Sequence, residues 1–290
     1  MFSMLKKKNQ PFCRSEYDPL EQVILCKPQY MEIKDVINDT QKHFKNEGIH
    51  IELALKQHKQ FVHALKSQGI DVIFLPALEN YPEQVFTRDI GFTLGQTIYV
   101  AEMASKIRQG EENVLKKWLE DEEISYYNLI GDRIEGGDVI IDRNKIFIGL
   151  SNRTNQDAIE HMRSLLPAYE VITIPFTEKY LHLDCVFNII SPHEAIYFPK
   201  AFTKKERNIL KYHYDLIEVS EEEQFTLGTN VLSIGHKKIF SLPSNKHVNE
   251  QLLSRGFEVI EIDITEIIKS GGSFRCCTLP IARAESKHEK

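Results

Sequence analysis

The stretch DVIIDRNKIFIGL, residues 138–150, holds two short apolar runs on either side of the polar residues 142–144. Runs rich in Val, Ile and Phe that are separated by such turn residues predict a β-hairpin. Apolar residues at helical spacing follow over 155–166, and a further apolar run over 169–174 ends at a proline. The stretch therefore opens a unit of strand, strand, helix and strand.

The same unit recurs along the chain. Further hairpins are expected at 86–101, 185–198 and 230–242, and each is followed by a helical segment and a strand. The helical segments are expected at 111–122, 203–212 and 246–255, and the closing strands at 125–129, 215–219 and 257–262. A longer first unit has strands at 23–26 and 71–75, a helix at 49–66, and a mixed segment at 29–47 that suggests a surface insertion.

About five such units at a spacing of roughly 45–50 residues predict a ring or a stack. Each unit combines a hairpin with a parallel crossover, so the sheets should be short and mixed. A closed α/β ring fits this pattern better than an open doubly wound sheet. We expect an arm at 1–14, a single domain at 15–283 and a tail at 284–290.

The composition narrows the class of protein. The chain has 290 residues, of which 42% are hydrophobic and 27% charged, as in globular proteins. A net charge of −6 argues against a nucleic-acid partner. No apolar run approaches the ~20 residues of a membrane span, and none follows the lysines at 6–8 as in a secretory signal. The five cysteines form no disulfide framework, so we expect reduced thiols and a cytoplasmic protein.

Residues that carry chemistry stand at matching places in successive units. The second unit opens with Phe-Thr-Arg-Asp at 86–89, the third with Glu-Gly-Gly-Asp at 135–138 and the fourth with Leu-His-Leu-Asp at 181–184, while the C-terminal segment has Gly-Gly-Ser-Phe-Arg-Cys at 271–276. In a ring, equivalent positions converge on the axis. Gathered carboxylates need a cationic partner, and a planar guanidinium pairs with them through two hydrogen bonds.

Each motif also has a structural interpretation. Asp89 could form a surface ion pair with Arg88. His182 could be a structural histidine, and Cys276 a small core residue. His182, Asp184 and Cys185 could ligate a metal, although neighbours on an extended segment point to opposite faces. The acidic run at 221–223 suggests a solvated loop.

Together, the four motifs resemble those of the guanidine-modifying, or pentein, superfamily, which includes arginine deiminases, amidinotransferases and dimethylarginine dimethylaminohydrolases. Residues 149–155 are most similar to the dimethylarginine dimethylaminohydrolase branch, and residues 15–20 are similar to the opening of the family. The resemblance covers about residues 15–283. It implies a five-bladed α/β propeller, a pseudo-fivefold repeat that agrees with the unit count.

The resemblance also implies roles for individual residues. Cys276 would be the nucleophile, and Cys277 a bystander in the packing. His182 would be the general acid and base, oriented by Glu135. The remaining residues would bind substrate. Asp89 and Glu135 would hold the guanidinium nitrogens, and Asp184 would grip the same group, as in deiminases and amidinotransferases. Arg153 and Arg108 would bind the α-carboxylate. Asp184 and Arg88 depart from the pattern of many dimethylarginine hydrolases.

The implied function is a hydrolase that cleaves a C–N bond in the guanidinium group of a free, dimethylarginine-type substrate. Citrulline and an amine would form through a covalent Cys-thiouronium intermediate. An arginine deiminase or an amidinotransferase is the alternative within the enzymes, and a catalytically silent binding module is the alternative outside them. No metal or cofactor is implied. The expected partners are a small guanidino substrate and, at most, a second copy of the chain in a homodimer.

Overall fold

The protein is seen here in a computed structural model that describes residues 10–131 and 133–285. It has a mixed α/β fold with five three-stranded sheets, which are β15-β1-β2, β3-β4-β5, β6-β7-β8, β9-β10-β11 and β12-β13-β14. The strands are β1 (Leu20–Cys26), β2 (Asp71–Leu75), β3 (Gly91–Leu94), β4 (Thr97–Val100), β5 (Tyr126–Asn128), β6 (Val139–Asp142), β7 (Lys145–Leu150), β8 (Glu170–Pro175), β9 (Phe187–Ile189), β10 (Glu194–Tyr197), β11 (Asp215–Glu218), β12 (Leu232–Ser233), β13 (Lys238–Ser241), β14 (Glu258–Glu261) and β15 (Leu279–Arg283).

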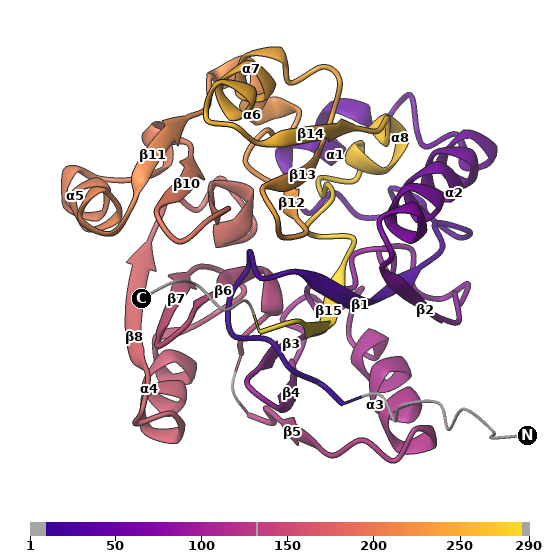
Figure 1. The fold of residues 1–290 in the computed structure, drawn as a ribbon. Helices are drawn as coiled ribbons and strands as arrows, with labels where there is room; N and C mark the ends of the chain where they lie inside the picture. The colour runs from indigo at the N-terminus through magenta and orange to yellow at the C-terminus, as the bar shows by residue number, and fades with distance from the viewer. Residues whose placement is uncertain (1–9, 132, 286–290) are drawn as a thin grey trace, which may run out of the picture.

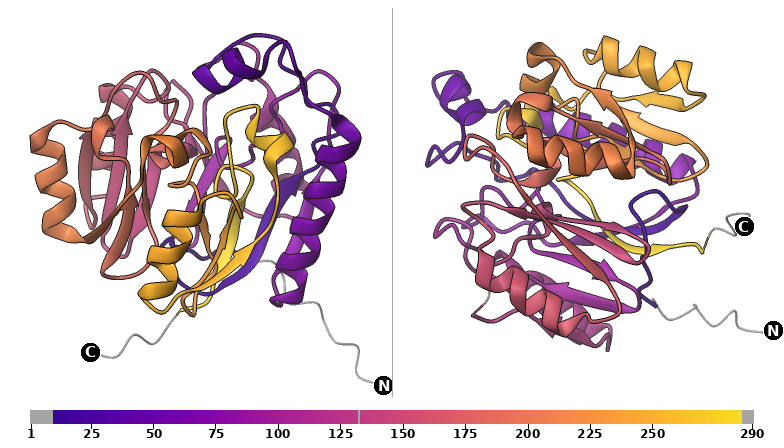
Figure 2. Two further views of the ribbon diagram at one scale, coloured as in Figure 1. Left: turned by 90° about the horizontal axis from the view of Figure 1, so that it is seen from above. Right: turned by 90° about the vertical axis from the view of Figure 1, so that its left-hand side faces the viewer.

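Helices connect and cover these sheets. They are α1 (Asp39–Phe44), α2 (Ile51–Ser67), α3 (Glu111–Asp121), α4 (Gln156–Leu165), α5 (Lys204–His213), α6 (Glu221–Phe225), α7 (Lys246–Ser254) and α8 (Thr265–Ile268), with 3₁₀ turns η1 (Gly136–Asp138), η2 (Leu183–Cys185) and η3 (Pro199–Ala201). Figure 1 shows α2, α3, α4, α5 and α7 around the periphery in chain order. Figure 2 shows α5 and α2 at opposite edges, with the sheets between them. This arrangement is consistent with the predicted pseudo-fivefold repeat.

The hairpin at 138–150 shows how the unit is built. Strand β6 pairs antiparallel with β7, which pairs parallel with β8 through partners such as Phe147 and Ile172. Helix α4 begins at the N-cap Asn155, whose side chain accepts a hydrogen bond from the backbone N–H of Ala158. The helix buries Ala158, Ile159 and Met162 in the same apolar cluster as β6 and β7. The other four sheets repeat this combination of one antiparallel and one parallel pairing.

The first sheet is completed by the other end of the chain. Strand β15 pairs antiparallel with β1, for example Ile24 with Leu279. The apolar residues after Cys277 were not assigned to a strand from the sequence, since their partner lies some 250 positions away. Just before β15, the chain forms backbone hydrogen bonds with Arg88, which precedes β3, and with Asn230, which precedes β12.

Several local predictions were wrong. The strand expected from Phe86 begins only at Gly91, because residues 86–90 form turns. Cys185 lies in η2 and not in β9. The segment 29–47 contains α1, and the acidic run at 221–223 opens α6.

Other corrections concern burial and the chain ends. Glu223 is buried and accepts hydrogen bonds from the backbone N–H groups of His247 and Val248, so it is no solvated loop residue. Of the expected arm, residues 1–9 lie outside the described residues, but Cys13 is buried and exchanges two backbone hydrogen bonds with Gly95. Residues 286–290 of the expected tail also lie outside the described part. In that part, no helix has the length and apolar character that a bilayer crossing requires.

Candidate active site

The Glu-Gly-Gly-Asp motif fixes a carboxylate behind the histidine. Glu135 is completely buried, and its Oε1 accepts a hydrogen bond from the backbone N–H of Ala104 at 2.9 Å. Its Oε2 lies 2.7 Å from Nε2 of His182. A Cβ at Gly137 would lie 2.7 Å from both Cγ of His182 and Oδ1 of Asp89, so only glycine allows this close approach.

His182 lies between two carboxylates. Opposite its Glu135 contact, Nδ1 is 3.5 Å from Oδ1 of Asp89. Burial by itself would lower the pKa of His182. The negative charge of Asp89 and the hydrogen bond from Glu135 outweigh burial and raise this pKa to about 10. The imidazole is therefore protonated at neutral pH.

Only one oxygen of the Asp89 carboxylate accepts a hydrogen bond from the described residues. Its Oδ2 accepts a hydrogen bond from Nη1 of Arg108 at 2.5 Å, whereas Oδ1 is buried and has no hydrogen-bond partner. Burial raises the pKa of Asp89, but His182 and Arg108 have the larger combined effect and lower it. The remaining donors of Arg108 are bound to Glu111 and to the backbone carbonyls of residues 83 and 86.

Asp184 has the same one-sided arrangement next to Cys276. Its Oδ2 accepts a hydrogen bond from Nη1 of Arg275 at 2.6 Å, and Arg275 also pairs with Glu16 at 3.0 Å. Sγ of Cys276 lies 3.6 Å from the same Oδ2. A hydrogen bond with the Cys185 thiol, burial and the charge of Asp184 all raise the pKa of Cys276. The thiol is therefore neutral while no cation occupies the site.

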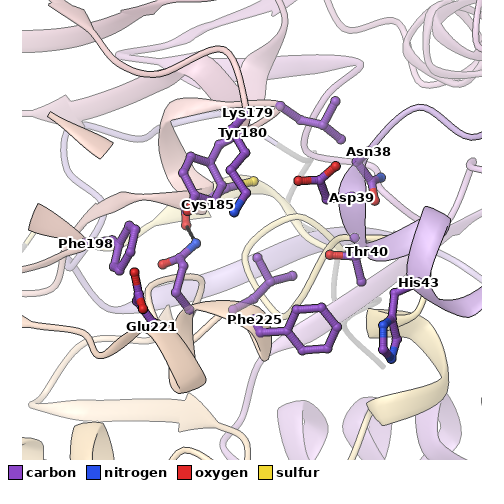
Figure 3. Close-up of a pocket in the computed structure, with 14 residues that line it drawn as sticks. Asn38, Asp39, Thr40, His43, Lys179, Tyr180, Cys185, Phe198, Glu221 and Phe225 are labelled. Atoms are coloured by element: carbon purple, nitrogen blue, oxygen red, sulfur yellow. Dashed lines mark hydrogen bonds between the residues drawn. The ribbon is translucent and has the colours of Figure 1, made fainter. Parts of the chain in front are cut away.

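Two neighbouring hollows lie at this site. The inner one, of about 10 Å³, has room for about one water molecule and is lined by Asp89, Arg108, His182 and Cys276 among others. The outer one has about 450 Å³ and shares Leu181, Cys185 and Gly271 with the inner one. We call the outer hollow the vestibule. Figure 3 shows its labelled side chains, which include the rings of Tyr180, Phe198 and Phe225 and the charged groups of Asp39, Lys179 and Glu221.

The structure thus brings most of the predicted site residues together. Cys276, His182, Asp89 and Arg108 line one hollow, Glu135 lies behind His182, and Asp184 contacts Cys276. Arg153 does not line that hollow, although its Nη1 lies 3.9 Å from Oε1 of Glu135. The alternative of a surface ion pair between Arg88 and Asp89 is wrong, since both side chains are buried and Asp89 pairs with Arg108.

Sequence reasoning missed several residues of the site. Arg275 and Glu16 form the ion pair that supports Asp184, and Cys185 lies beside the proposed nucleophile. Glu83 lines the inner hollow, accepts hydrogen bonds from Gln41 and Ser270, and has a pKa that burial raises to about 7. In the sequence, Arg275 stands next to Cys276, Cys185 was considered only as a possible metal ligand, and Glu16 lies in the stretch that resembles the opening of the family, whereas Glu83 gave no local signal.

Two groups of side chains have the ligand types of a metal site. They are Asp89, Glu135 and His182, and Asp184, Cys185 and Cys276. The second group exists because η2 is a turn and not the extended segment that was expected, so Asp184 and Cys185 both face Cys276. In the first group, Asp89 is already hydrogen-bonded to Arg108, and Glu135 is already hydrogen-bonded to the backbone of Ala104 and the ring of His182.

Several known proteins are similar to this chain in sequence and in fold. Residues 27–283 match the family model described as N,N dimethylarginine dimethylhydrolase, eukaryotic. The chain is 53% identical over 283 residues to the uncharacterized protein YkgA of Bacillus subtilis, covering 98% of this chain and 99% of that protein. It is 25% identical to the N(G),N(G)-dimethylarginine dimethylaminohydrolase of Mycobacterium tuberculosis, covering 80% of this chain and 77% of the relative.

A solved structure extends the comparison. The N-terminal domain of ArgZ, an arginine dihydrolase of the cyanobacterial ornithine-ammonia cycle, was crystallised bound to product and superimposes with a TM-score of 0.83. Its sequence identity is 25%, and the match covers 92% of this chain and 98% of that domain. The chain spans 37% of the full bifunctional ArgZ of Synechocystis, to which it is 28% identical. On the family match and the likeness to YkgA, the chain belongs to the N,N-dimethylarginine dimethylhydrolase family of the pentein superfamily.

Proposed function

We propose that the protein is a hydrolase that cleaves a C–N bond in the guanidinium group of a free arginine derivative. The observation that carries the proposal is Oδ1 of Asp89, a buried carboxylate oxygen without a hydrogen-bond partner in the hollow that also holds Cys276 and His182. Buried polar atoms are normally paired, so an unpaired acceptor indicates a missing donor. A guanidinium supplies such a donor together with a positive charge.

The second carboxylate supports the same ligand. Arg275 binds Oδ2 of Asp184, while the nearest side-chain groups to Oδ1 are the weakly donating thiols of Cys185 and Cys276. A substrate guanidinium that takes Oδ1 of Asp89 and Oδ1 of Asp184 brings its central carbon next to Sγ of Cys276. This geometry favours Arg108 as the group that orients Asp89, in place of the contact with the substrate carboxylate expected from the sequence.

The reaction follows from this arrangement. The thiolate of Cys276 attacks the guanidinium carbon and forms a C–S bond. The leaving nitrogen takes a proton from His182 as its C–N bond breaks, which leaves a thiouronium. His182 then removes a proton from a water molecule that attacks the same carbon. The C–S bond breaks, the thiolate is restored, and the product is a urea such as citrulline.

The positive charge of the substrate favours the thiolate form of Cys276. Burial, Cys185 and Asp184 raise the pKa of Cys276 in the empty site. A guanidinium cation within a few ångströms stabilises the thiolate and lowers that pKa. The nucleophile is thus generated when substrate arrives.

The substrate head group is the remaining element of the proposal. We infer that Arg153 binds the α-carboxylate, since its guanidinium lies close to Glu135 at the edge of the site. We also infer that the five sheets form a five-bladed propeller with this site on its axis. The reduced thiols fit a cytoplasmic enzyme.

The test is turnover by wild type and Cys276→Ser. Purified protein is incubated with arginine, its methylated derivatives and other guanidino compounds, and the ureido product and the released amine are both measured. Wild type should form both in equal amounts, and Cys276→Ser should form neither. Comparable turnover by the variant refutes the proposal.

Two further measurements separate the alternatives. A new guanidine that forms only when an acceptor amine is present indicates an amidinotransferase, and ammonia from arginine itself indicates a deiminase. A haloacetamidine distinguishes an enzyme from a silent binding module. The proposal requires Cys276 to react faster than free cysteine, and a slower reaction supports the binding module.

A further inference from the structure

A second thiol lies beside the proposed nucleophile, and the reaction above does not use it. Sγ of Cys185 and Sγ of Cys276 lie within 4.8 Å of each other. Both sulfurs also contact the carboxylate of Asp184, at 3.7 Å for Cys185 and 3.6 Å for Cys276. Both thiols therefore point toward the carboxylate of Asp184.

The backbones that carry these thiols are fixed relative to each other. The side chain of Asn230 donates a hydrogen bond to the carbonyl of Asp184 and accepts one from the backbone N–H of Cys276, both at 3.1 Å. The carbonyl of Cys185 accepts hydrogen bonds from the side chains of Gln224 and Thr229. A disulfide requires the sulfurs to approach to about 2.05 Å. Rotation of the two short side chains is the movement that the proposal requires.

A small oxidant can reach this pair. Cys185 lines both the vestibule and the inner hollow, and Cys276 lines the inner hollow. The inner hollow has the volume of about one water molecule, close to that of a hydroperoxide group. Cys277 is also buried, but it lines neither hollow.

We propose that Cys185 is a resolving thiol that captures oxidised Cys276 in a reversible disulfide. Without a bound cation, the thiolate of Cys276 is a minor form next to the neutral thiol, and it is this form that attacks one oxygen of hydrogen peroxide. The O–O bond breaks, and with the proton that the thiol lost, the products are a sulfenic acid and one water molecule. The thiolate of Cys185 then attacks the sulfenic sulfur, and the S–O bond breaks as the S–S bond forms. The departing hydroxide takes up the proton that Cys185 lost. Overall, two thiols and one peroxide give one disulfide and two water molecules.

The consequence for catalysis rests on the proposed function. The disulfide removes the nucleophile and places a covalent bridge beside Leu181 and Gly271, where the vestibule meets the inner hollow. An external dithiol reduces the bridge by thiol–disulfide exchange and restores the site. Without Cys185, the sulfenic acid would continue to the sulfinic acid, which dithiols do not reduce.

The experiment uses the full chain treated with hydrogen peroxide, then alkylated and mapped by peptide mass spectrometry. In wild type, we expect a cross-linked peptide pair that contains Cys185 and Cys276, and we expect dithiothreitol to abolish it. The matched control is Cys277→Ser, which should keep the cross-link. Cys185→Ser should lose it and accumulate sulfinic acid at Cys276.

The outcomes separate this proposal from the proposed function. A bond between Cys276 and Cys277, or sulfinic acid at Cys276 with Cys185 still reduced in wild type, overturns the resolving role. The peptide map of wild type requires neither turnover nor a variant. It therefore tests the resolving role of Cys185 even if Cys185→Ser does not fold. The proposed function instead fails on Cys276→Ser turnover. If turnover exists, peroxide should abolish it and dithiothreitol should restore it in wild type but not in Cys185→Ser.

Discussion

Replacing Gly137 with alanine tests whether His182 acts from the position seen here. The added Cβ would lie 2.7 Å from Cγ of His182, and ordinary van der Waals contact begins at 3.4 Å. The imidazole must therefore move by about 0.7 Å, since Oδ1 of Asp89 also meets this Cβ at 2.7 Å and limits its movement. Misplacement of a catalytic group by about 1 Å can cost roughly 100-fold in rate. We expect Gly137→Ala to lower kcat/KM by about 100-fold, or about 2.7 kcal/mol of transition-state stabilisation.

The assay is formation of ureido product at several substrate concentrations, combined with urea unfolding of the same samples. Overpacking should lower the free energy of unfolding by about 1–3 kcal/mol, so the variant should remain folded at assay temperature. Gly228→Ala is the control for overpacking away from the imidazole, because its Cβ would press on the backbone oxygen of Glu223 at 3.1 Å and on no residue of the site. If folded Gly137→Ala has the kcat/KM of wild type, the position of His182 does not govern the reaction and the assignment is wrong.

Two other substitutions test the buried charges. Arg275→Met leaves Asp184 without its arginine partner and Glu16 with Arg88 alone. The change should lower the free energy of unfolding by about 3–5 kcal/mol, as measured in urea, and a loss below about 1 kcal/mol would contradict the network. Burial raises the pKa of Glu83 from 4.5 to about 7, so folded wild type binds a proton that the unfolded chain releases, and stability falls as pH rises between these values. Glu83→Gln has no proton to lose at this position. Its free energy of unfolding relative to wild type should therefore increase by up to about 3 kcal/mol as the pH rises from 4.5 to 7. Parallel pH profiles of stability for the two proteins would refute the reasoning.

The repeat could be predicted from the sequence because the signals for each unit lie within that unit. Hairpins and amphipathic helices depend on apolar spacing within about 15 residues, and the strands and helices of the third unit fall within a residue or two of their predicted bounds. The pairing of β15 with β1 has no such local signal, since the partners stand at opposite ends of the chain. The turns at 86–90 and η2 were also missed, because apolar residues there face the centre of the molecule without forming strands.

The candidate site was predictable to the extent that its motifs occupy matching places in the repeat. Cys276, His182, Asp89 and Glu135 come together for this reason. What the sequence could not supply is the partner of each buried group. Arg275 lies within the C-terminal motif and Arg108 stands 19 residues after Asp89, but only the fold determines which carboxylate each of them binds.

These pairings bear on how a substrate can bind and leave. Arg108 and Arg275 each occupy one oxygen of a buried aspartate, Asp89 and Asp184. The arginine holds one oxygen of each aspartate, and under the proposed function the second oxygen remains available for a substrate guanidinium. A cationic substrate gains a charge-assisted hydrogen bond at each aspartate. The urea that the proposed reaction forms is neutral and loses that attraction. The same two arginines that keep the site ready for the cation therefore also favour release of the product.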